Sequence, residues 1–341
     1  MNRQLIVFTG KAVCVLAIAG CVSVASTPPA MSKRAQMHMG TLVTITAVAP
    51  TEAAALQAVT AGFREIHRLE EILSTWIAAS DLSRVNAAAG REPVRVAREA
   101  FLLIKRSLEM AALTEGGFNI AVGPAVDAWS VTERAHIPTT DELTGLKPLV
   151  DLEQVHLDEQ AGTVFLSRPG MRVDVGGIGK GFAADRAAAA MQGAGATAGV
   201  VALSGDIKTF GRMPVGERFR FGIQHPRKEG MVLASLELEN EAISTAGDYE
   251  RYFERDGVRY HHILDPQTLQ PARQCRSVTV VAAEGTVADG LDTGIFVMGP
   301  ERGMALVERL PEVEAVIVDG TGNVLVSSGL KARLRIEDAS P

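Results

Sequence analysis

Hydrophobic residues follow two kinds of pattern along the chain, and these patterns predict short strands and a few longer helices. Polar and apolar side chains alternate in residues 37–49, which predicts a strand. Apolar residues recur every three or four positions in residues 52–73, which predicts a helix with one buried face. A similar pattern predicts a second helix at about 98–114.

The other hydrophobic segments are short and are separated by turns. Asp256 and Gly257 lie between two aromatic-rich runs, which predicts a hairpin because glycine supplies the positive φ of a tight turn. Further strands are predicted at 155–157, 164–166, 200–203, 219–224, 231–238, 277–282, 315–318 and 324–327. These elements predict a mixed α/β (α+β) fold with a largely antiparallel sheet core and flanking helices.

The segment 242–272 is dense in reactive and backbone-bending residues. His261 and His262 follow the predicted hairpin, and Pro266 ends their strand soon afterwards. Because successive side chains of a strand face opposite sides, only one of the two histidines can point into a cleft. His262, beside the loop, is the candidate. An ordinary polar residue at a strand end is the alternative interpretation.

The composition is that of a globular protein with a well-filled core. Of 341 residues, 47% are hydrophobic and 22% are charged, which fits one large domain or two interlocked ones. The formal net charge is −6, and the sequence has no basic run and no basic patch with interleaved aromatic residues. Nucleic acid is therefore not an expected partner.

The first residues have the pattern of an export signal. Basic residues precede an apolar run at 12–19, which is too short to span a bilayer. The sequence IAGC at 18–21 resembles the lipobox of bacterial lipoproteins, in which the cysteine is lipidated. We expect a signal peptide at 1–20 and a lipid on Cys21 that anchors the exported protein to a bacterial membrane, facing the periplasm. A cleaved signal with an incidental cysteine is the alternative.

Residues 21–34 are expected to be a flexible tether between the lipid and the folded body, because this stretch is rich in serine, threonine and proline. Cys14 would leave with the signal, and Cys21 would carry the lipid. Only Cys275 would remain, so no disulfide could form within the mature chain.

A glycine-rich segment, VDVGGIGKGFAAD, occupies residues 173–185. A strand, a glycine-rich turn and a helix beginning near Lys180 would bring backbone N–H groups and one cation to a phosphate. The segment matches neither the Walker loop nor the Rossmann fingerprint. Close packing of the helix on the strand is the alternative reason for its glycines.

Residues 288–299 contain candidates for a cation site. If this stretch opens a helix, Asp289 and Thr293 lie four residues apart on one face, where a carboxylate and a hydroxyl can reach the same cation. Asp292 adds a second carboxylate. Capping of the helix by acidic residues in its first turn is the alternative.

The sequence TAGDY at 245–249, followed by YHHILDPQT at 260–268, resembles a signature of the ApbE family of FAD:protein FMN transferases. Six further segments resemble motifs of this family, in the family's order: 39–41, 74–86, 116–129, 173–185, 204–207 and 288–299. The resemblance implies an ApbE-like, T-fold-related flavin transferase domain at 35–335, a compact unit of two interlocked subdomains.

The resemblance implies transfer of FMN from FAD to a threonine hydroxyl of another protein, with AMP released. His262 would be the catalytic base toward this hydroxyl, or would only orient a phosphate oxygen. The acceptor would be an exported or membrane protein, such as a redox-pump subunit or an FMN-binding domain. With water as the acceptor, the same site would be an FAD pyrophosphatase. Without turnover, the protein would be an FAD-binding lipoprotein.

The resemblance also implies which residues bind ligands. Mg²⁺ would be bound by Asp289, Thr293 and the Gly177 carbonyl, with Asp292 as a further ligand. The nucleotide would be contacted by Met39, Trp76, Gly117, Phe118, Asn119, Asp174, Lys180, Thr245, Gly247 and Ile263.

Three residues depart from the family pattern, which has aspartate at Asn119 and glycine at Ser204 and Leu269. The Asn119 amide oxygen can still accept a hydrogen bond, but the charge of a carboxylate is lost. Ser204 reduces the space at its position. Asn119 and Leu269 favour the interpretation without turnover, whereas the other site residues favour an enzyme.

Overall fold

The computed structural model describes residues 28–214 and 216–337. The predicted signal peptide, the predicted lipidation site Cys21 and the first part of the predicted tether lie outside these residues. No helix of the described ranges is long and apolar enough to cross a membrane. Cys275 is a buried free thiol.

The main sheet has eight strands, and its neighbouring strands all pair antiparallel. Their order across the sheet is β1 (Ala30–His38), β2 (Thr41–Ala49), β6 (Ala198–Leu203), β7 (Asp206–Phe210), β10 (Ala242–Gly247), β13 (Cys275–Ala282), β14 (Glu314–Asp319) and β15 (Val324–Val326). The predicted mixed fold with a largely antiparallel core is confirmed.

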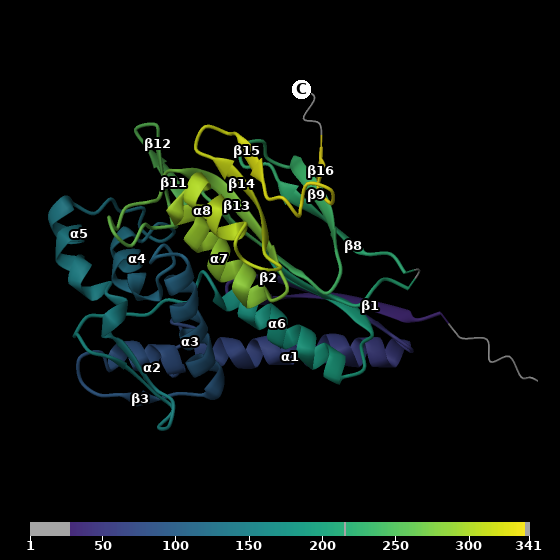
Figure 1. Cartoon of the computed structure of the whole chain (residues 1–341). Coiled ribbons are helices and arrows are strands. Elements are labelled where there is room, and N and C mark those ends of the chain that lie inside the picture. The colour runs from purple at the N-terminus through teal and green to yellow at the C-terminus, as the bar shows by residue number, and fades with distance from the viewer. Residues whose placement is uncertain (1–27, 215, 338–341) are drawn as a thin grey trace, which may run out of the picture.

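Three helices cover one face of the main sheet (Figure 1). They are α1 (Glu52–Leu73), α6 (Gly179–Gly193) and α7 (Gly285–Met298), and α8 (Pro300–Val307) follows α7. The middle helix, α6, packs on both α1 and α7. Its buried positions are mainly alanine and glycine, which let its backbone approach both neighbours closely.

A second, smaller sheet covers the other face. It consists of β16 (Arg335–Ile336), β9 (Val232–Leu238) and β8 (Phe219–Gln224). Strand β13 is buried on both sides: Val280 belongs to the core under the helices, whereas Val281 packs in the cluster under the small sheet. Seven of its eight residues are buried, so even the polar side chains of Ser277 and Thr279 lie inside the fold.

The remaining elements lie beside one end of the main sheet (Figure 1). A hairpin, β11 (Tyr252–Arg255) and β12 (Val258–His261), confirms the predicted turn at Asp256 and Gly257. The others are α2 (Asp81–Ala87), β3 (Val94–Arg95), α3 (Arg98–Leu113), η1 (Ile120–Val122), α4 (Gly123–Trp129), α5 (Thr140–Leu146), η2 (Lys147–Leu149), η3 (Leu152–Gln154), β4 (Val155–Asp158) and β5 (Thr163–Leu166).

The N-terminal part of the fold differs from the prediction. The single strand expected at 37–49 is two strands, β1 and β2, joined by a turn in which Met39 has φ 50° and Gly40 has φ 70°. Strand β1 also includes residues 30–34, which lie within the predicted tether. The folded region therefore begins before residue 35, because β1 pairs along its length with β2.

Candidate active site

A cleft of about 390 Å³ lies where the β1–β2 turn, the start of α6, helix α7 and the loop after β12 meet. Most of the ligand-binding residues predicted from the sequence line it. They are Met39, Gly117, Phe118, Asn119, Asp174, Gly177, Lys180, Thr245, Gly247, His262, Ile263, Asp289, Asp292 and Thr293. The sequence motifs, far apart along the chain, therefore converge on one site.

Trp76 is the predicted nucleotide contact that the structure does not bring to this cleft. Its side chain is 84% exposed, in the loop between α1 and α2, and it is not among the residues of the cleft wall. The other tryptophan, Trp129, is fully buried and donates from Nε1 to the Leu269 carbonyl at 2.7 Å. Neither indole ring is placed to stack on a ligand in the cleft.

Three carboxylates form a buried cluster in the cleft. Asp206 begins β7, and Asp289 and Asp292 lie one turn apart on α7. Each has an oxygen within 4.8 Å of an oxygen of the other two, and each residue is 3% exposed or less. Such a cluster needs compensating positive charge, because burying an uncompensated carboxylate is costly.

Asp206 was not predicted as a site residue, although it lies in a segment that resembles the family. Strand pairing places it here: Ile207 of β7 is opposite Ile243 of β10, so Asp206 faces Ser244. The Ser244 hydroxyl contacts both Asp206 and, at 2.6 Å, Asp292. One hydroxyl hydrogen cannot serve two carboxylates, so one of these contacts requires a proton or a cation.

Lys180 supplies part of the compensating charge. Its ammonium group donates to Asp206 Oδ2. Burial works against the charged lysine, but the nearby charges of Asp206, Asp289 and Asp292 outweigh it and raise the pKa of Lys180. The pKa of Asp289 and of Asp292 is also raised, first by burial and then by the neighbouring carboxylates. One ammonium group does not balance three buried carboxylates.

Two glycines of the segment 173–185 have different structural roles. A Cβ at Gly181 would lie 2.1 Å from the Gly285 carbonyl oxygen, so this glycine allows α6 to pack against α7. Gly177 lines the cleft, and a Cβ there would lie 3.0 Å from Thr293 Oγ1. Gly181 therefore serves close packing, although its packing partner is a helix rather than a strand, and Gly177 forms part of the cleft wall.

Thr293 lies beside the carboxylates but is already hydrogen-bonded. Its Oγ1 donates to Asp292 Oδ1 at 3.1 Å. Asp289 accepts at 2.8 Å from the backbone N–H of Gly181, which fixes its carboxylate across the α6–α7 contact. The predicted pair of Asp289 and Thr293 is thus brought together, with Asp206 as an additional carboxylate.

The two histidines after the hairpin face opposite ways, as predicted. His261 is buried; its Nε2 donates to the Ala272 carbonyl at 2.7 Å, and its Nδ1 accepts from Ile263 N at 3.2 Å. His262 lines the cleft, and its Nδ1 lies 3.2 Å from the Arg251 carbonyl. Because a carbonyl only accepts, Nδ1 carries the proton and Nε2 keeps a free lone pair.

The environment keeps His262 neutral. Burial against the cleft wall, with a smaller effect of the Arg251 charge, lowers the pKa of His262 to about 3. Nε2 is therefore unprotonated at physiological pH, but so low a pKa makes it a weak base, because proton transfer is most efficient when the pKa lies near the operating pH. A general-base role needs this pKa to rise when a negatively charged substrate binds.

Local geometry accounts for Asn119, and it shows why the family has glycine at the other two positions of departure. Asn119 caps η1 by accepting from Ala121 N at 2.7 Å, and its amide nitrogen donates to the Val150 carbonyl at 3.0 Å. A carboxylate could not make the second bond. Ser204 and Leu269 have φ values of 56° and 58°, in the left-handed region that favours glycine. Both positions show why glycine would fit there without strain.

The sequence and the fold identify the family. The ApbE family model matches residues 39–317. A FAD:protein FMN transferase of Treponema pallidum is 35% identical over 325 residues, which cover 90% of this chain and 89% of that protein. One of Vibrio cholerae is 36% identical over 278 residues, covering 78% and 83%. The chain therefore belongs to the ApbE family.

Solved structures agree with this assignment. An ApbE protein of Thermotoga maritima has a TM-score of 0.83 at 30% identity, covering 89% of this chain and 99% of that chain. The flavin transferase ApbE of Vibrio cholerae has a TM-score of 0.81 at 30% identity, covering 90% and 100%.

Proposed function

We propose that this protein is a Mg²⁺-dependent FAD:protein FMN transferase that attaches FMN to a threonine hydroxyl of an acceptor protein. The relatives that carry this name cover most of the chain. The observation that carries the proposal is the cleft, where three buried carboxylates, a lysine and a neutral histidine lie together.

The carboxylate cluster fits a hard divalent cation. Asp206, Asp289 and Asp292 offer oxygen ligands within 4.8 Å of one another, and oxygen is the ligand that Mg²⁺ prefers. The Ser244 hydroxyl lies between two carboxylates and can donate to only one of them, so a cation or a proton would stabilise the other contact. Bound there, Mg²⁺ would neutralise charge on the diphosphate of FAD.

Lys180 is placed to bind phosphate. It lies in the wall of the cleft in the first turn of α6, beside Gly176 and Gly177 of the preceding turn. The backbone N–H groups of Gly179 and Gly181 are already hydrogen-bonded, to the Val175 carbonyl and to Asp289, so the ammonium group is the phosphate-binding donor here. A diphosphate bound here would be oriented for attack at the phosphorus of its FMN half.

His262 is proposed as the general base. Its Nε2 would take the proton from the threonine hydroxyl while the hydroxyl oxygen attacks the FMN phosphorus. A phosphoester bond forms between the threonine oxygen and the FMN phosphorus. The bond from this phosphorus to the bridging oxygen of the diphosphate breaks, and AMP leaves with that oxygen. The Arg251 carbonyl holds Nδ1–H and thereby fixes which nitrogen accepts the proton.

Export and lipid anchoring are part of the proposal. The apolar run at 12–19 and the lipobox-like sequence at 18–21 support a lipid on Cys21, with the enzyme held at the periplasmic face of a membrane. The acceptor would then be an exported or membrane protein such as a redox-pump subunit or an FMN-binding domain. Metabolic labelling with a fatty acid, lost in Cys21→Ala, would test the anchor.

The transfer itself is tested by mass spectrometry of a threonine-bearing acceptor fragment after incubation with the protein, FAD and Mg²⁺. We expect an added FMN mass that is abolished in His262→Ala and retained in His156→Ala, the control, because His156 is an exposed histidine on β4 that does not line the cleft. Release of FMN and AMP without an added mass would instead establish the pyrophosphatase. Bound FAD without either product would establish a flavin carrier.

A further inference from the structure

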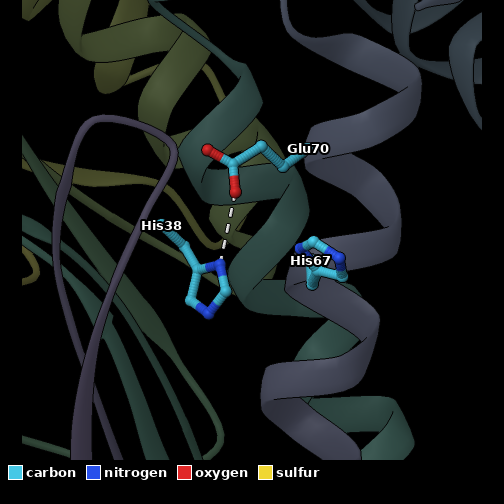
Figure 2. A group of neighbouring side chains, drawn as sticks. All are labelled: His38, His67 and Glu70. Atoms are coloured by element: carbon cyan, nitrogen blue, oxygen red, sulfur yellow. Dashed lines mark hydrogen bonds and ion pairs between the residues drawn. The ribbon is translucent and has the colours of Figure 1, made fainter. Parts of the chain in front are cut away.

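A second group of metal-ligating side chains lies outside the carboxylate cluster. It consists of His38 at the end of β1 and His67 and Glu70, which lie about one turn apart on α1 (Figure 2). Each offers a ligand atom within 4.8 Å of those of the other two. The proposed transfer reaction uses none of these three side chains. We call them the histidine cluster.

Two members of the histidine cluster already face each other. His38 Nδ1 lies 3.2 Å from Glu70 Oε2 (Figure 2). His38 Nε2 lies 3.1 Å from the Gln36 amide oxygen. If Nε2–H donates to the Gln36 oxygen, Nδ1 is the ring nitrogen that faces the Glu70 carboxylate. This arrangement, with one ring nitrogen directed at a ligand site and the other held by an oxygen, is typical of metal-bound imidazoles.

His67 can complete the group. Its side chain is 61% exposed, and its ring centroid lies 5.8 Å from that of His38. Its present contact, 3.6 Å to the exposed Glu71, is weak and easily exchanged. A tetrahedral ion with bonds of about 2.0–2.1 Å would hold its ligand atoms roughly 3.3 Å apart. The exposed His67 side chain is free to close that gap by rotation.

The ligand types select the ion. Two imidazoles and one carboxylate form the three-ligand set found in some zinc enzymes, with a water in the fourth position. Imidazole nitrogen suits Zn²⁺ and its transition-metal neighbours, whereas Mg²⁺ prefers oxygen ligands. We infer that His38, His67 and Glu70 bind one transition-metal ion of the zinc class, separately from the Mg²⁺ proposed for the carboxylate cluster.

The histidine cluster is connected to the cleft through Glu70. While Oε2 faces His38, Oε1 accepts at 2.6 Å from the backbone N–H of Met39. Met39 has a positive φ of 50° and lines the cleft. An ion held by Glu70 would therefore also restrain the turn that carries Met39. Zinc occupancy should change the affinity of the cleft for FAD.

Zinc titration of the purified protein in excess Mg²⁺, followed by calorimetry, tests the site. We expect one zinc equivalent per chain, with an affinity that falls at least about tenfold in His67→Ala. His136→Ala is the matched control, because His136 is also an exposed histidine beside a single glutamate, at 3.8 Å from Glu142, and it should bind zinc as the wild type does. Equal zinc binding by wild type and His67→Ala would overturn the inference.

Two further measurements distinguish the histidine cluster from the carboxylate cluster and test its link to the cleft. Co²⁺ in place of Zn²⁺ should give the visible absorption bands of tetrahedral cobalt, and His67→Ala should lose them. Zinc that is displaced by added Mg²⁺ would belong to the carboxylate cluster and would overturn the site. FAD titration with and without zinc tests the link through Met39: an unchanged FAD affinity in zinc-loaded wild type would overturn that link, whether or not the protein transfers FMN.

Discussion

The two groups of ligating side chains differ most in their burial. Asp206, Asp289 and Asp292 are almost fully buried on β7 and α7, whereas the side chain of His67 is 61% exposed. Buried carboxylates must be compensated by cations, because water cannot solvate them. In the histidine cluster the side chains of His38 and Glu70 are 14% and 23% exposed, so water still reaches this pair when no metal is present. The carboxylate cluster therefore requires a cation to compensate its negative charge, whereas the histidine cluster can exist with or without one.

The largest expected effect tests that requirement. Asp292→Asn keeps the shape of the side chain but removes one buried charge, so we expect transfer activity to fall at least about 100-fold, because a metal site of this kind contributes several kcal/mol to the reaction. The variant should also melt at a higher temperature than the wild type when Mg²⁺ is absent, since repulsion between carboxylates is relieved. Activity assays and thermal melts measure both.

Asp185→Asn is the matched control for this variant. Asp185 is also a carboxylate within the fold, but it accepts from Gly285 N and Thr286 N at the start of α7 rather than facing the cluster. Its loss should lower the melting temperature and leave the Mg²⁺-induced stabilisation in place. An Asp292→Asn variant with wild-type activity would show that the cluster is not the metal site.

Lys180→Met tests the cluster from the opposite side. It removes the ammonium group that contacts Asp206, so we expect unfolding in urea to require about 3 kcal/mol less free energy. Mg²⁺ should restore part of this loss, because an ion that binds only the folded chain stabilises it. If Mg²⁺ stabilises the wild type and the variant equally, Lys180 and the metal do not compensate the same charges.

His261 extends the comparison to pH. Burial lowers the pKa of His261 to about 4, against an ordinary value of 6.5. Between these values the unfolded chain binds a proton that the folded chain does not, so the free energy of unfolding falls as the pH drops, by up to about 3 kcal/mol. His261→Gln should make this dependence shallower between pH 6.5 and 4, as measured by urea unfolding, while His262, whose pKa is also lowered, keeps its own contribution. The same slope in the variant would contradict the prediction.

The smallest effect concerns the turn before Asp206. Ser204 has φ 56°, so glycine would relieve about 1 kcal/mol of backbone strain in the folded chain. Glycine would also raise the conformational entropy of the unfolded chain, which destabilises the fold by a similar free energy. We expect Ser204→Gly to change the free energy of unfolding by less than about 1 kcal/mol and to leave transfer activity unchanged. A large loss of activity would mean that the Ser204 side chain itself acts in the cleft.

Local sequence patterns predicted the elements that depend on neighbouring residues. Helix α1 lies at 52–73 because its apolar spacing and the Thr51 cap define both its face and its start. The Asp256–Gly257 hairpin formed as predicted, and strand alternation correctly separated His261 from His262. These features need no knowledge of which strands pair across the sheet.

Features that depend on distant pairing were missed. Asp206 joins the carboxylates because β7 pairs with β10. In this pairing Ile207 lies opposite Ile243, 36 positions further along the chain, and no local pattern specifies that register.

Trp76 was expected in the cleft, but its loop points its side chain into solvent. The motif containing Trp76 matched the family in sequence, and residue type alone could not show the direction of the loop.

The contact between Gly181 and Gly285 sets more than the packing of two helices. It fixes how far the backbone bearing Lys180 lies from the backbone bearing Asp289, with no side chain available to widen the gap. Coulomb energies in a poorly solvated cleft change steeply over one ångström. A methyl group at Gly181 would push the two helices apart. It would thereby weaken the electrostatic attraction between the Lys180 ammonium and the carboxylates, although no ionisable residue is changed.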